Sequence, residues 1–204
     1  AEAVIPLPMG VDIEQAAMLK ANPATAYLML HDIVPMQAGD WVIQNAANSS
    51  CGRYLIRLAG LAGVKTVNVV RRPELVDEIR ALGADIVLVD GPDLAQRVAA
   101  ATGGAPIKLG IDAVAGAATQ RIAECLAPGS TVLSYGSMTN TRCELDFYLM
   151  FRNDIRLEGM SFARQFQKLR QPAEVRALYA KLADLMARGV LVAKIAGVYP
   201  LDRI

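Results

Sequence analysis

The stretch from residue 41 to residue 72, WVIQNAANSSCGRYLIRLAGLAGVKTVNVVRR, contains a strand, a helix and a second strand in immediate succession. Trp41–Asn45 is a short apolar strand, and Cys51–Leu61 carries apolar residues at helical spacing before Gly63, which ends the helix. Lys65–Val70 is the second apolar strand. This order predicts a βαβ unit, whose two strands lie parallel in one sheet.

The alternation of strand and helix continues after this unit. A helix that begins at Pro73 and ends at Gly83 has its acids early and Arg80 late, as the helix dipole favours. Further strands are predicted at 86–89, 109–114, 131–135 and 155–159, and further helices at 92–101, 117–126 and 173–188. The pattern predicts an α/β fold: a doubly wound Rossmann domain with about six parallel strands and helices on both faces.

Composition excludes several classes of function. The chain has 204 residues, of which 53% are hydrophobic, enough for one sizeable core. The net charge of +1 offers no basic surface for nucleic acid, and no apolar run reaches the roughly 18 residues that span a membrane. Three widely spaced cysteines and a single histidine, His31, argue against a disulfide framework and against a metal site. A reducing compartment fits this cysteine usage best.

The ends of the chain differ from its middle. The first residues form an extended segment with two prolines, followed by a helix from about Asp12 and helical character again over Ala24–His31. This is not the βα start of a Rossmann domain. We expect residues 1–20 to be the tail of a preceding domain with a connecting helix, and residues 21–204 to form the Rossmann domain. The last residues, VYPLDRI, stop without a closing helix, so we expect a piece of a longer protein.

The turn over residues 46–52, AANSSCG, lies where a Rossmann domain binds a dinucleotide pyrophosphate. Such turns generally carry three glycines, and this one keeps only Gly52, in the position that packs helix against strand. Ala46 and Ser49 stand where the other glycines would be, while the hydroxyls of Ser49 and Ser50 can donate to phosphate. Taken alone, the turn is equally typical of a capped surface helix.

Arg71 and Arg72 end the second strand, about twenty residues beyond the turn, where the fold places the adenosine ribose. An acid at this point bonds the free 2′-hydroxyl of NAD, whereas an arginine accommodates the 2′-phosphate of NADP. Two arginines without an acid favour NADP(H). The alternative is that both arginines merely end a surface strand.

The ends of the later strands offer small residues but no evident catalytic group. Residues 113–116 and 134–138 would border the nicotinamide, and Tyr135 is better interpreted as a packing residue than as a proton donor. Asp112 lies inside a strand with no partner apparent from the sequence, and Cys51 occupies a slot where a small apolar residue would serve. No acid–base pair or nucleophile stands out, so catalytic residues stay unassigned.

These segments together resemble the zinc-free branch of the medium-chain dehydrogenase/reductase superfamily, most closely the mitochondrial-type trans-2-enoyl thioester (enoyl-CoA) reductases. The resemblance covers essentially the whole chain. It rests on NPATAY (22–27), GD (39–40), VIQNA (42–46) with NS (48–49), NVVRRP (68–73), LGA (82–84), YGSM (135–138) and Gly189.

The resemblance implies NADPH-dependent reduction of the 2,3 double bond of an enoyl thioester, or of another small electrophilic alkene, with hydride going to C3 and a proton to C2. It also implies that a tyrosine of an N-terminal GroES-like domain, outside this chain, assists. Together with Gly52 of the turn, the implied cofactor-binding residues are Asn22, Asn48, Ser49, Ser50, Cys51, Arg71, Arg72, Tyr135, Gly136, Ser137, Met138, Met160, Ser161 and Phe162.

The chain departs from the family pattern at three places. Ser50 and Cys51 replace the usual Gly and Val after the asparagine and serine of the turn, and the Arg-Arg-Pro motif is one residue shorter than usual. Residues 160–162 replace a segment that carries a tryptophan. Two alternatives therefore stay open: an NADPH:quinone oxidoreductase of the same superfamily, and a non-catalytic nucleotide-binding module.

The resemblance further implies a homodimer that pairs two Rossmann sheets edge to edge, for which the sequence itself carries no signal. Nucleic acid and membrane are not expected partners. The expected compartment is the bacterial cytoplasm or the mitochondrial matrix, and the chain shows no targeting segment of its own.

Overall fold

The computed structural model describes residues 6–168 and 172–203 and contains one six-stranded parallel sheet. The strand order is β3-β2-β1-β4-β5-β6, and all five pairings are parallel. This order is the one expected of a doubly wound Rossmann sheet, so the predicted fold class is confirmed. The strands are β1 Trp41–Gln44, β2 Lys65–Val70, β3 Ile86–Val89, β4 Ile107–Asp112, β5 Thr131–Ser134 and β6 Arg156–Gly159.

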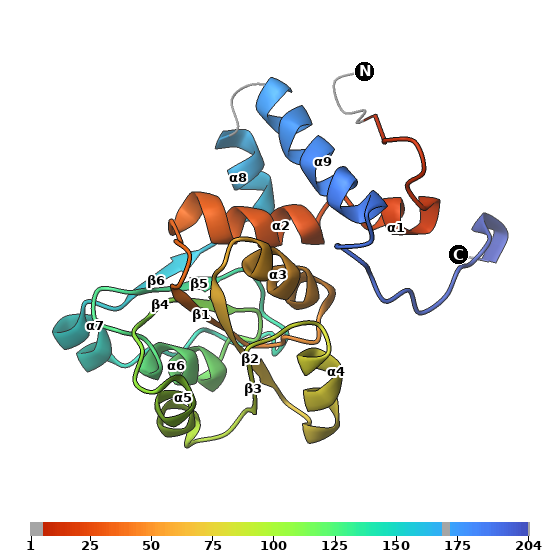
Figure 1. Cartoon of the computed structure of the whole chain (residues 1–204). Coiled ribbons are helices and arrows are strands. Elements are labelled where there is room, and N and C mark those ends of the chain that lie inside the picture. Colours follow the sequence, from red (N-terminus) through yellow and green to blue (C-terminus); the bar gives the residue numbers. More distant parts are fainter. Residues whose placement is uncertain (1–5, 169–171, 204) are drawn as a thin grey trace.

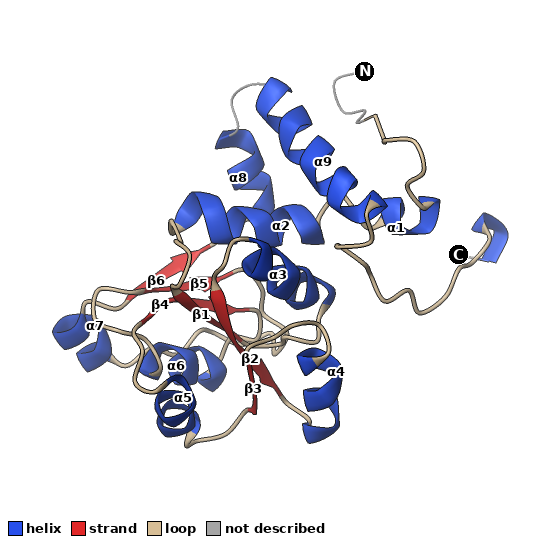
Figure 2. Ribbon diagram, in the orientation of Figure 1, coloured by secondary structure: helices blue, strands red, loops and turns tan. Residues whose placement is uncertain are grey.

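Helices cover both faces of the sheet, as predicted (Figures 1 and 2). On one face, α2 and α3 pack on the apolar side chains of β1, β4 and β5, with α9 outside them. On the other face, α5 and α6 pack on a second apolar cluster. The α-helices are α1 Ile13–Ala17, α2 Asn22–Leu28, α3 Ser50–Leu61, α4 Val76–Arg80, α5 Leu94–Thr102, α6 Ala117–Glu124, α7 Phe147–Asn153, α8 Phe162–Lys168 and α9 Pro172–Ala187.

Most predicted strands and helices are confirmed with small shifts at their ends. The fourth strand lies at Ile107–Asp112 rather than at 109–114, because the carboxylate of Asp112 accepts bonds from the next backbone N–H groups and turns the chain away. The helix predicted from Pro73 begins as a 3-10 turn, Pro73–Leu75, and becomes α-helical only at Val76. Three segments were not anticipated: α7, α8 and a 3-10 turn at Leu201–Arg203.

Gly110 explains how closely helix and sheet approach on the α6 face. A Cβ added to Gly110 would lie 2.5 Å from Cγ2 of Ile122, which belongs to α6. Real Cβ atoms do not come that close, so only glycine permits this helix to rest on β4. The sequence shows this glycine in the middle of a strand, where it marks a close approach rather than a turn.

The N-terminal segment packs on the last long helix. The hydroxyl of Tyr179 in α9 donates to the carbonyl of Lys20 at 2.7 Å. The amide of Gln15 in α1 accepts from the N–H of Ala193 at 2.7 Å and donates to its carbonyl at 3.2 Å. Residues 6–20 therefore contact the Rossmann unit directly, while their origin in a preceding domain stays a prediction. Asn22 and Pro23 begin α2, two residues before the helical segment expected from Ala24.

Within residues 6–168 and 172–203, no helix has the length and apolar character needed to cross a membrane.

Candidate functional site

The turn between β1 and α3 keeps the geometry of a phosphate-binding turn with fewer glycines. Ala46 adopts a positive φ of 47°, the conformation that glycine would supply. Ser49 caps α3, its hydroxyl oxygen accepting from the N–H of Gly52 at 3.1 Å. A Cβ on Gly52 would lie 2.8 Å from the carbonyl oxygen of Ala47, so this glycine is required for packing, as predicted. The first N–H groups of α3 have no partner within the helix and point out of its positive end.

Asp112 is the buried anchor at the point between β1 and β4 where the order of the parallel strands reverses. Its carboxylate accepts from the Asn45 amide at 2.6 Å, the Thr119 hydroxyl at 2.7 Å, and two backbone N–H groups at 2.9 and 3.1 Å. The Asn45 side chain in turn accepts from the N–H of Ala113 at 2.8 Å. The expectation that Asp112 has no partner was wrong. Asn45 lies 67 positions away, and the nearer partners reach the carboxylate because the chain turns directly after β4. This network holds open the crevice in which a Rossmann fold binds its ligand.

Cys51 and Tyr135 meet beside the start of α3. Burial raises the pKa of the Cys51 thiol from 9.0 to about 12, although a hydrogen bond with Tyr135 opposes the rise. Burial, followed by the charge of the nearby thiol, also raises the pKa of Tyr135, whose hydroxyl contacts Ser49. Both groups stay protonated near neutral pH. The predicted packing role of Cys51 fits this geometry better than a reactive thiolate does.

A cavity of about 390 Å³ opens at the carboxyl ends of β1, β2 and β4. It brings together four residues predicted from the sequence: Asn48, Arg71, Arg72 and Met138. Met138 reaches it because its N–H bonds the carbonyl of Ala113, which folds the loop after β5 over the end of β4. The full lining is Asn45, Ala46, Asn48, Val69, Val70, Arg71, Arg72, Leu75, Asp90, Val114, Met138 and Thr139.

The two arginines give this cavity its charge. Both are exposed, and only Arg72 has a carboxylate partner within the described part of the chain, Glu74 at 3.5 Å. An ion pair between such exposed side chains contributes little free energy, so Arg72 can exchange Glu74 for a ligand at small cost. The cavity therefore places two available cations next to the positive end of α3, an arrangement that attracts a phosphorylated ligand.

The remaining predicted residues lie outside the lining of this cavity. Gly136 approaches the backbone of Ala113, where a Cβ would come within 3.2 Å of its carbonyl oxygen. Met160 is buried in the core on the α2–α3 face, and the ring of Phe162 packs on Phe166 with centroids 4.9 Å apart. Asn22, Ser50, Ser137 and Ser161 are exposed, and Ser49, Cys51, Gly52 and Tyr135 adjoin the cavity through the start of α3.

Several lining residues were missed by sequence reasoning. Asn45 and Asp90 each directly follow a strand, and Thr139 lies in the loop after β5, whereas Val114 falls within the predicted segment 113–116. The rule that ligands bind outside the carboxyl ends of strands could have found Asn45 and Asp90. Thr139 carries no comparable signal, because its place depends on the bond from its hydroxyl to the carbonyl of Val114 at 2.7 Å.

Across residues 6–168 and 172–203, no three or more His, Cys, Asp and Glu side chains come together in a way that could hold a metal ion.

Comparison with known proteins gives a consistent family assignment. A family model described as zinc-binding dehydrogenase matches residues 51–183. The mouse mitochondrial enoyl-[acyl-carrier-protein] reductase is 35% identical over 206 residues, an alignment that covers 98% of this chain and 55% of the relative. The chain thus spans about half the length of the curated relatives that it matches.

Two solved structures share the fold closely. The mitochondrial 2-enoyl thioester reductase Etr1p/Etr2p heterodimer from Candida tropicalis is 26% identical with a TM-score of 0.84, covering 97% of this chain and 58% of that chain. A complex of Etr1p with NADP and crotonyl-CoA is 26% identical with a TM-score of 0.80, covering 89% of this chain and 52% of that chain.

Proposed function

Because the chain belongs to the zinc-binding dehydrogenase family of the medium-chain dehydrogenase/reductase superfamily, we propose that it is the NADPH-binding part of an enoyl thioester reductase. The observation that carries this proposal is the cavity in which Arg71 and Arg72 meet the turn at the start of α3. A free positive helix end and two adjacent cations suit a dinucleotide with an additional phosphate on its ribose.

The residues at this edge fit each part of NADPH. Arg71 and Arg72 would bond the 2′-phosphate, and the N–H groups at the start of α3 would bond the pyrophosphate. The requirement for Gly52 keeps the start of α3 packed against the turn, since a side chain there would displace the backbone of Ala47. The ends of β4 and β5, with Val114, Tyr135 and Met138, would border the nicotinamide.

The chemistry that NADPH supplies when bound is a hydride, delivered to C3 of the enoyl thioester. The residues of this chain bind and orient the cofactor, and the partly buried phenol of Tyr135 stays protonated beside Ser49. No group in the described chain is assigned to polarise the thioester carbonyl. We place that task in a preceding GroES-like domain, of which residues 1–20 would be the tail.

We propose an enoyl thioester as the substrate, carried by coenzyme A or by acyl carrier protein. The mouse relative is named for the acyl carrier protein, and the Etr1p complex contains crotonyl-CoA. The proposed cofactor-binding set also includes Met160, Ser161 and Phe162, which follow the edge strand β6. Because the relatives are mitochondrial, we propose the mitochondrial matrix or, for a bacterial source, the cytoplasm.

We also propose a homodimer formed along the β6 edge of the sheet. All four residues of β6 are exposed, and its outer side pairs with no strand among the described residues. The neighbouring α7 exposes Phe147 and Phe151, whose rings stack with centroids 5.6 Å apart. Exposed edges and large apolar side chains are typical of surfaces that another chain covers. Sedimentation of the Phe151→Glu variant against the unmodified chain tests this surface, and an unchanged dimer would contradict it.

The cofactor proposal is tested by calorimetric titration of the chain with NADPH and with NADH. We expect NADPH to bind more tightly, and the difference to shrink by about tenfold or more in the Arg71→Ala/Arg72→Ala variant, since each tenfold corresponds to about 1.4 kcal/mol. Arg80→Ala is the matched control, because Arg80 forms an exposed pair with Asp77 and does not line the cavity. Equal affinity for the two cofactors would contradict the proposal.

A further inference from the structure

Asp90 brings a negative charge into the cavity that Arg71 and Arg72 line. It directly follows β3, and its N–H donates to the carbonyl of Val70, the residue before Arg71, at 2.8 Å. Its position is therefore next to the proposed site of the 2′-phosphate. A carboxylate at the ribose end of a Rossmann site favours a free 2′-hydroxyl. Without a cationic partner, the carboxylate of Asp90 would repel the 2′-phosphate that the two arginines attract.

Arg121, which does not line the cavity, neutralises the charge of Asp90. It belongs to α6, and its Nε and Nη2 donate to the two carboxylate oxygens of Asp90 at 2.7 and 2.6 Å. The N–H of Gly91 also donates to Asp90, at 2.9 Å. The hydrogen bond with Asp90 raises the pKa of Arg121, so the guanidinium stays charged. Such a bidentate ion pair neutralises the carboxylate and fixes its orientation.

Arg121 does not itself line the cavity, so it can act on a ligand there only through Asp90. We infer that Arg121 sets the preference for NADPH over NADH by neutralising Asp90 and holding its carboxylate away from the 2′-phosphate. This inference rests on the proposed function and deepens it. Arg121 is thus a positioning residue for the 2′-phosphate site, contributed by a helix 31 residues further along the chain than Asp90.

Variants that remove one or both charges of the Asp90–Arg121 pair distinguish neutralisation from a purely structural role. Removing Arg121 alone leaves a carboxylate unpaired beside the phosphate. Removing both charges, in Asp90→Asn/Arg121→Met, abolishes the ion pair but leaves no charge to repel the phosphate. A structural role predicts that the double variant is as impaired as the single one, whereas neutralisation predicts that it recovers.

The experiment uses two small probes of the adenosine half: 2′,5′-ADP, which carries the 2′-phosphate, and AMP, which lacks it. Each is titrated calorimetrically into the chain and its variants. We expect Arg121→Met to weaken 2′,5′-ADP about tenfold and AMP less than about threefold, since a nearby unpaired charge acts mainly on the extra phosphate. Arg121→Lys keeps the positive charge but loses the bidentate hydrogen bonds of the guanidinium. It should retain most of the preference for 2′,5′-ADP over AMP. The double variant should restore the original ratio.

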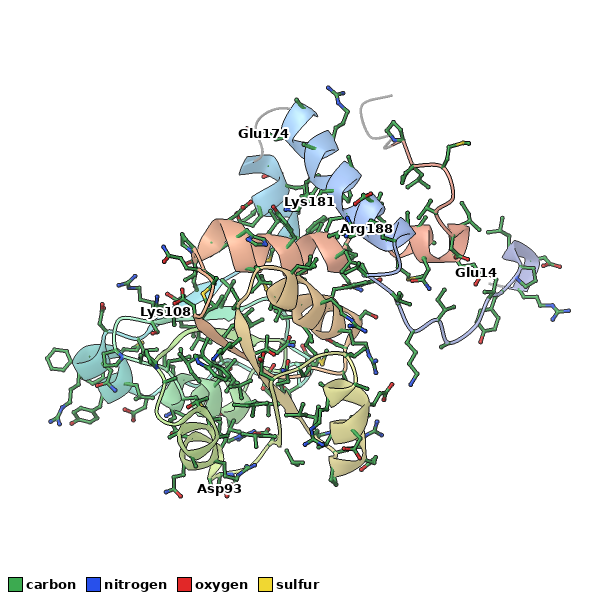
Figure 3. All side chains as sticks on the ribbon, in the orientation of Figure 1. Glu14, Asp93, Lys108, Glu174, Lys181 and Arg188 are labelled. Atoms are coloured by element: carbon green, nitrogen blue, oxygen red, sulfur yellow. The ribbon has the colours of Figure 1, made fainter. Side chains whose placement is uncertain are left out.

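Arg188→Met is the matched control. Arg188 pairs with Asp184 at 3.1 Å on α9, on the side of the molecule away from α6 (Figure 3). Its removal should leave the ratio of the two affinities unchanged. A change as large as that of Arg121→Met would show that any lost arginine has this effect, and would overturn the inference.

The outcomes separate this inference from the proposed function. If the unmodified chain binds 2′,5′-ADP no more tightly than AMP, the proposed NADPH site is wrong, and the role of Arg121 falls with it. If the preference exists but Arg121→Met retains it, only the role of Arg121 is wrong. Should Arg121→Met fail to fold, the double variant decides: a preserved preference supports neutralisation, and a lost preference contradicts it.

Discussion

The turn before α3 and the arginines after β2 line the same cavity but are built in opposite ways. Around the turn, Asn45 and Asp112 are almost fully buried and bonded to one another and to backbone groups. Arg71 and Arg72 are exposed, with one long ion pair between them and the rest of the described chain. The turn is thus part of the folded core, whereas the arginines are exposed and available to bind a ligand.

This difference separates two kinds of change. A substitution in the turn region removes bonds on which the fold depends, so its main effect should appear in the free energy of unfolding. A substitution of the arginines removes contacts that only a ligand makes, so its main effect should appear in affinity.

The largest loss of stability should come from Asp112→Ala. It leaves the Asn45 amide, the Thr119 hydroxyl and two N–H groups without their buried acceptor. We expect the free energy of unfolding to fall by about 4 kcal/mol, as for other broken buried networks. Chemical denaturation measures this loss. Asp93→Ala is the control, since Asp93 is exposed and its pair with the partly buried Arg97 should be worth less than about 1 kcal/mol. Similar losses for the two variants would contradict the anchoring role of Asp112.

Gly52→Ala should cost less, about 2 kcal/mol, because the new Cβ would lie 2.8 Å from the carbonyl oxygen of Ala47 and must shift backbone. Gly60 offers a matched control in the same helix, because a Cβ there meets nothing within 4 Å. Gly60→Ala should stabilise the chain by about 0.5–1 kcal/mol through better helix propensity. Thermal unfolding of both variants compares them, and an unchanged or raised stability of Gly52→Ala would show that the turn is not tightly packed.

Much of this region could be predicted from the sequence, because its signals are local. The β1–α3–β2 unit follows from apolar spacing, Gly52 follows from the position of the turn, and Arg71 and Arg72 follow from the length of the unit. These residues lie within about thirty positions of one another in a βαβ unit, where the chain geometry is nearly fixed.

The remaining parts of the site could not be predicted, because their signals are distant in the sequence. The partners of Asp112 include Asn45, which is 67 positions away, and Arg121 lies 31 positions from Asp90. Only the order of strands and helices in space brings such pairs together. Met160 and Phe162, which the resemblance implies at the site, pack in or on the core outside the lining of the cavity, and their part in cofactor binding stays a prediction.

Alkaline pH offers a smaller test of the buried character of the turn region. Burial raises the pKa of Cys51 from 9.0 to about 12, so above pH 9 the thiol ionises in the unfolded chain but not in the folded one. Its contribution to stability is therefore complete below pH 9 and is lost as the pH rises from 9 to about 12. At pH 10 the loss should be about 1.4 kcal/mol for this thiol.

Cys51→Val should remove this part of the pH dependence. Denaturation at pH 7 and at pH 10 should show a smaller drop in the free energy of unfolding for the variant than for the unmodified chain. Equal drops would mean that the thiol is not buried as the structure places it. The turn region would then be exposed to solvent, as the two arginines are.

The smallest effect on stability should come from Arg71→Ala/Arg72→Ala, within about 0.5 kcal/mol without ligand, because exposed side chains contribute little to folding. With ligand the same variant should differ. NADPH at 100 times its dissociation constant should stabilise the unmodified chain by about 2.7 kcal/mol, and a tenfold weaker variant at the same concentration by about 1.4 kcal/mol. Thermal unfolding with and without NADPH measures both quantities. A variant that is destabilised without ligand would show that the arginines support the fold, and the division between core turn and ligand-binding cations would not hold.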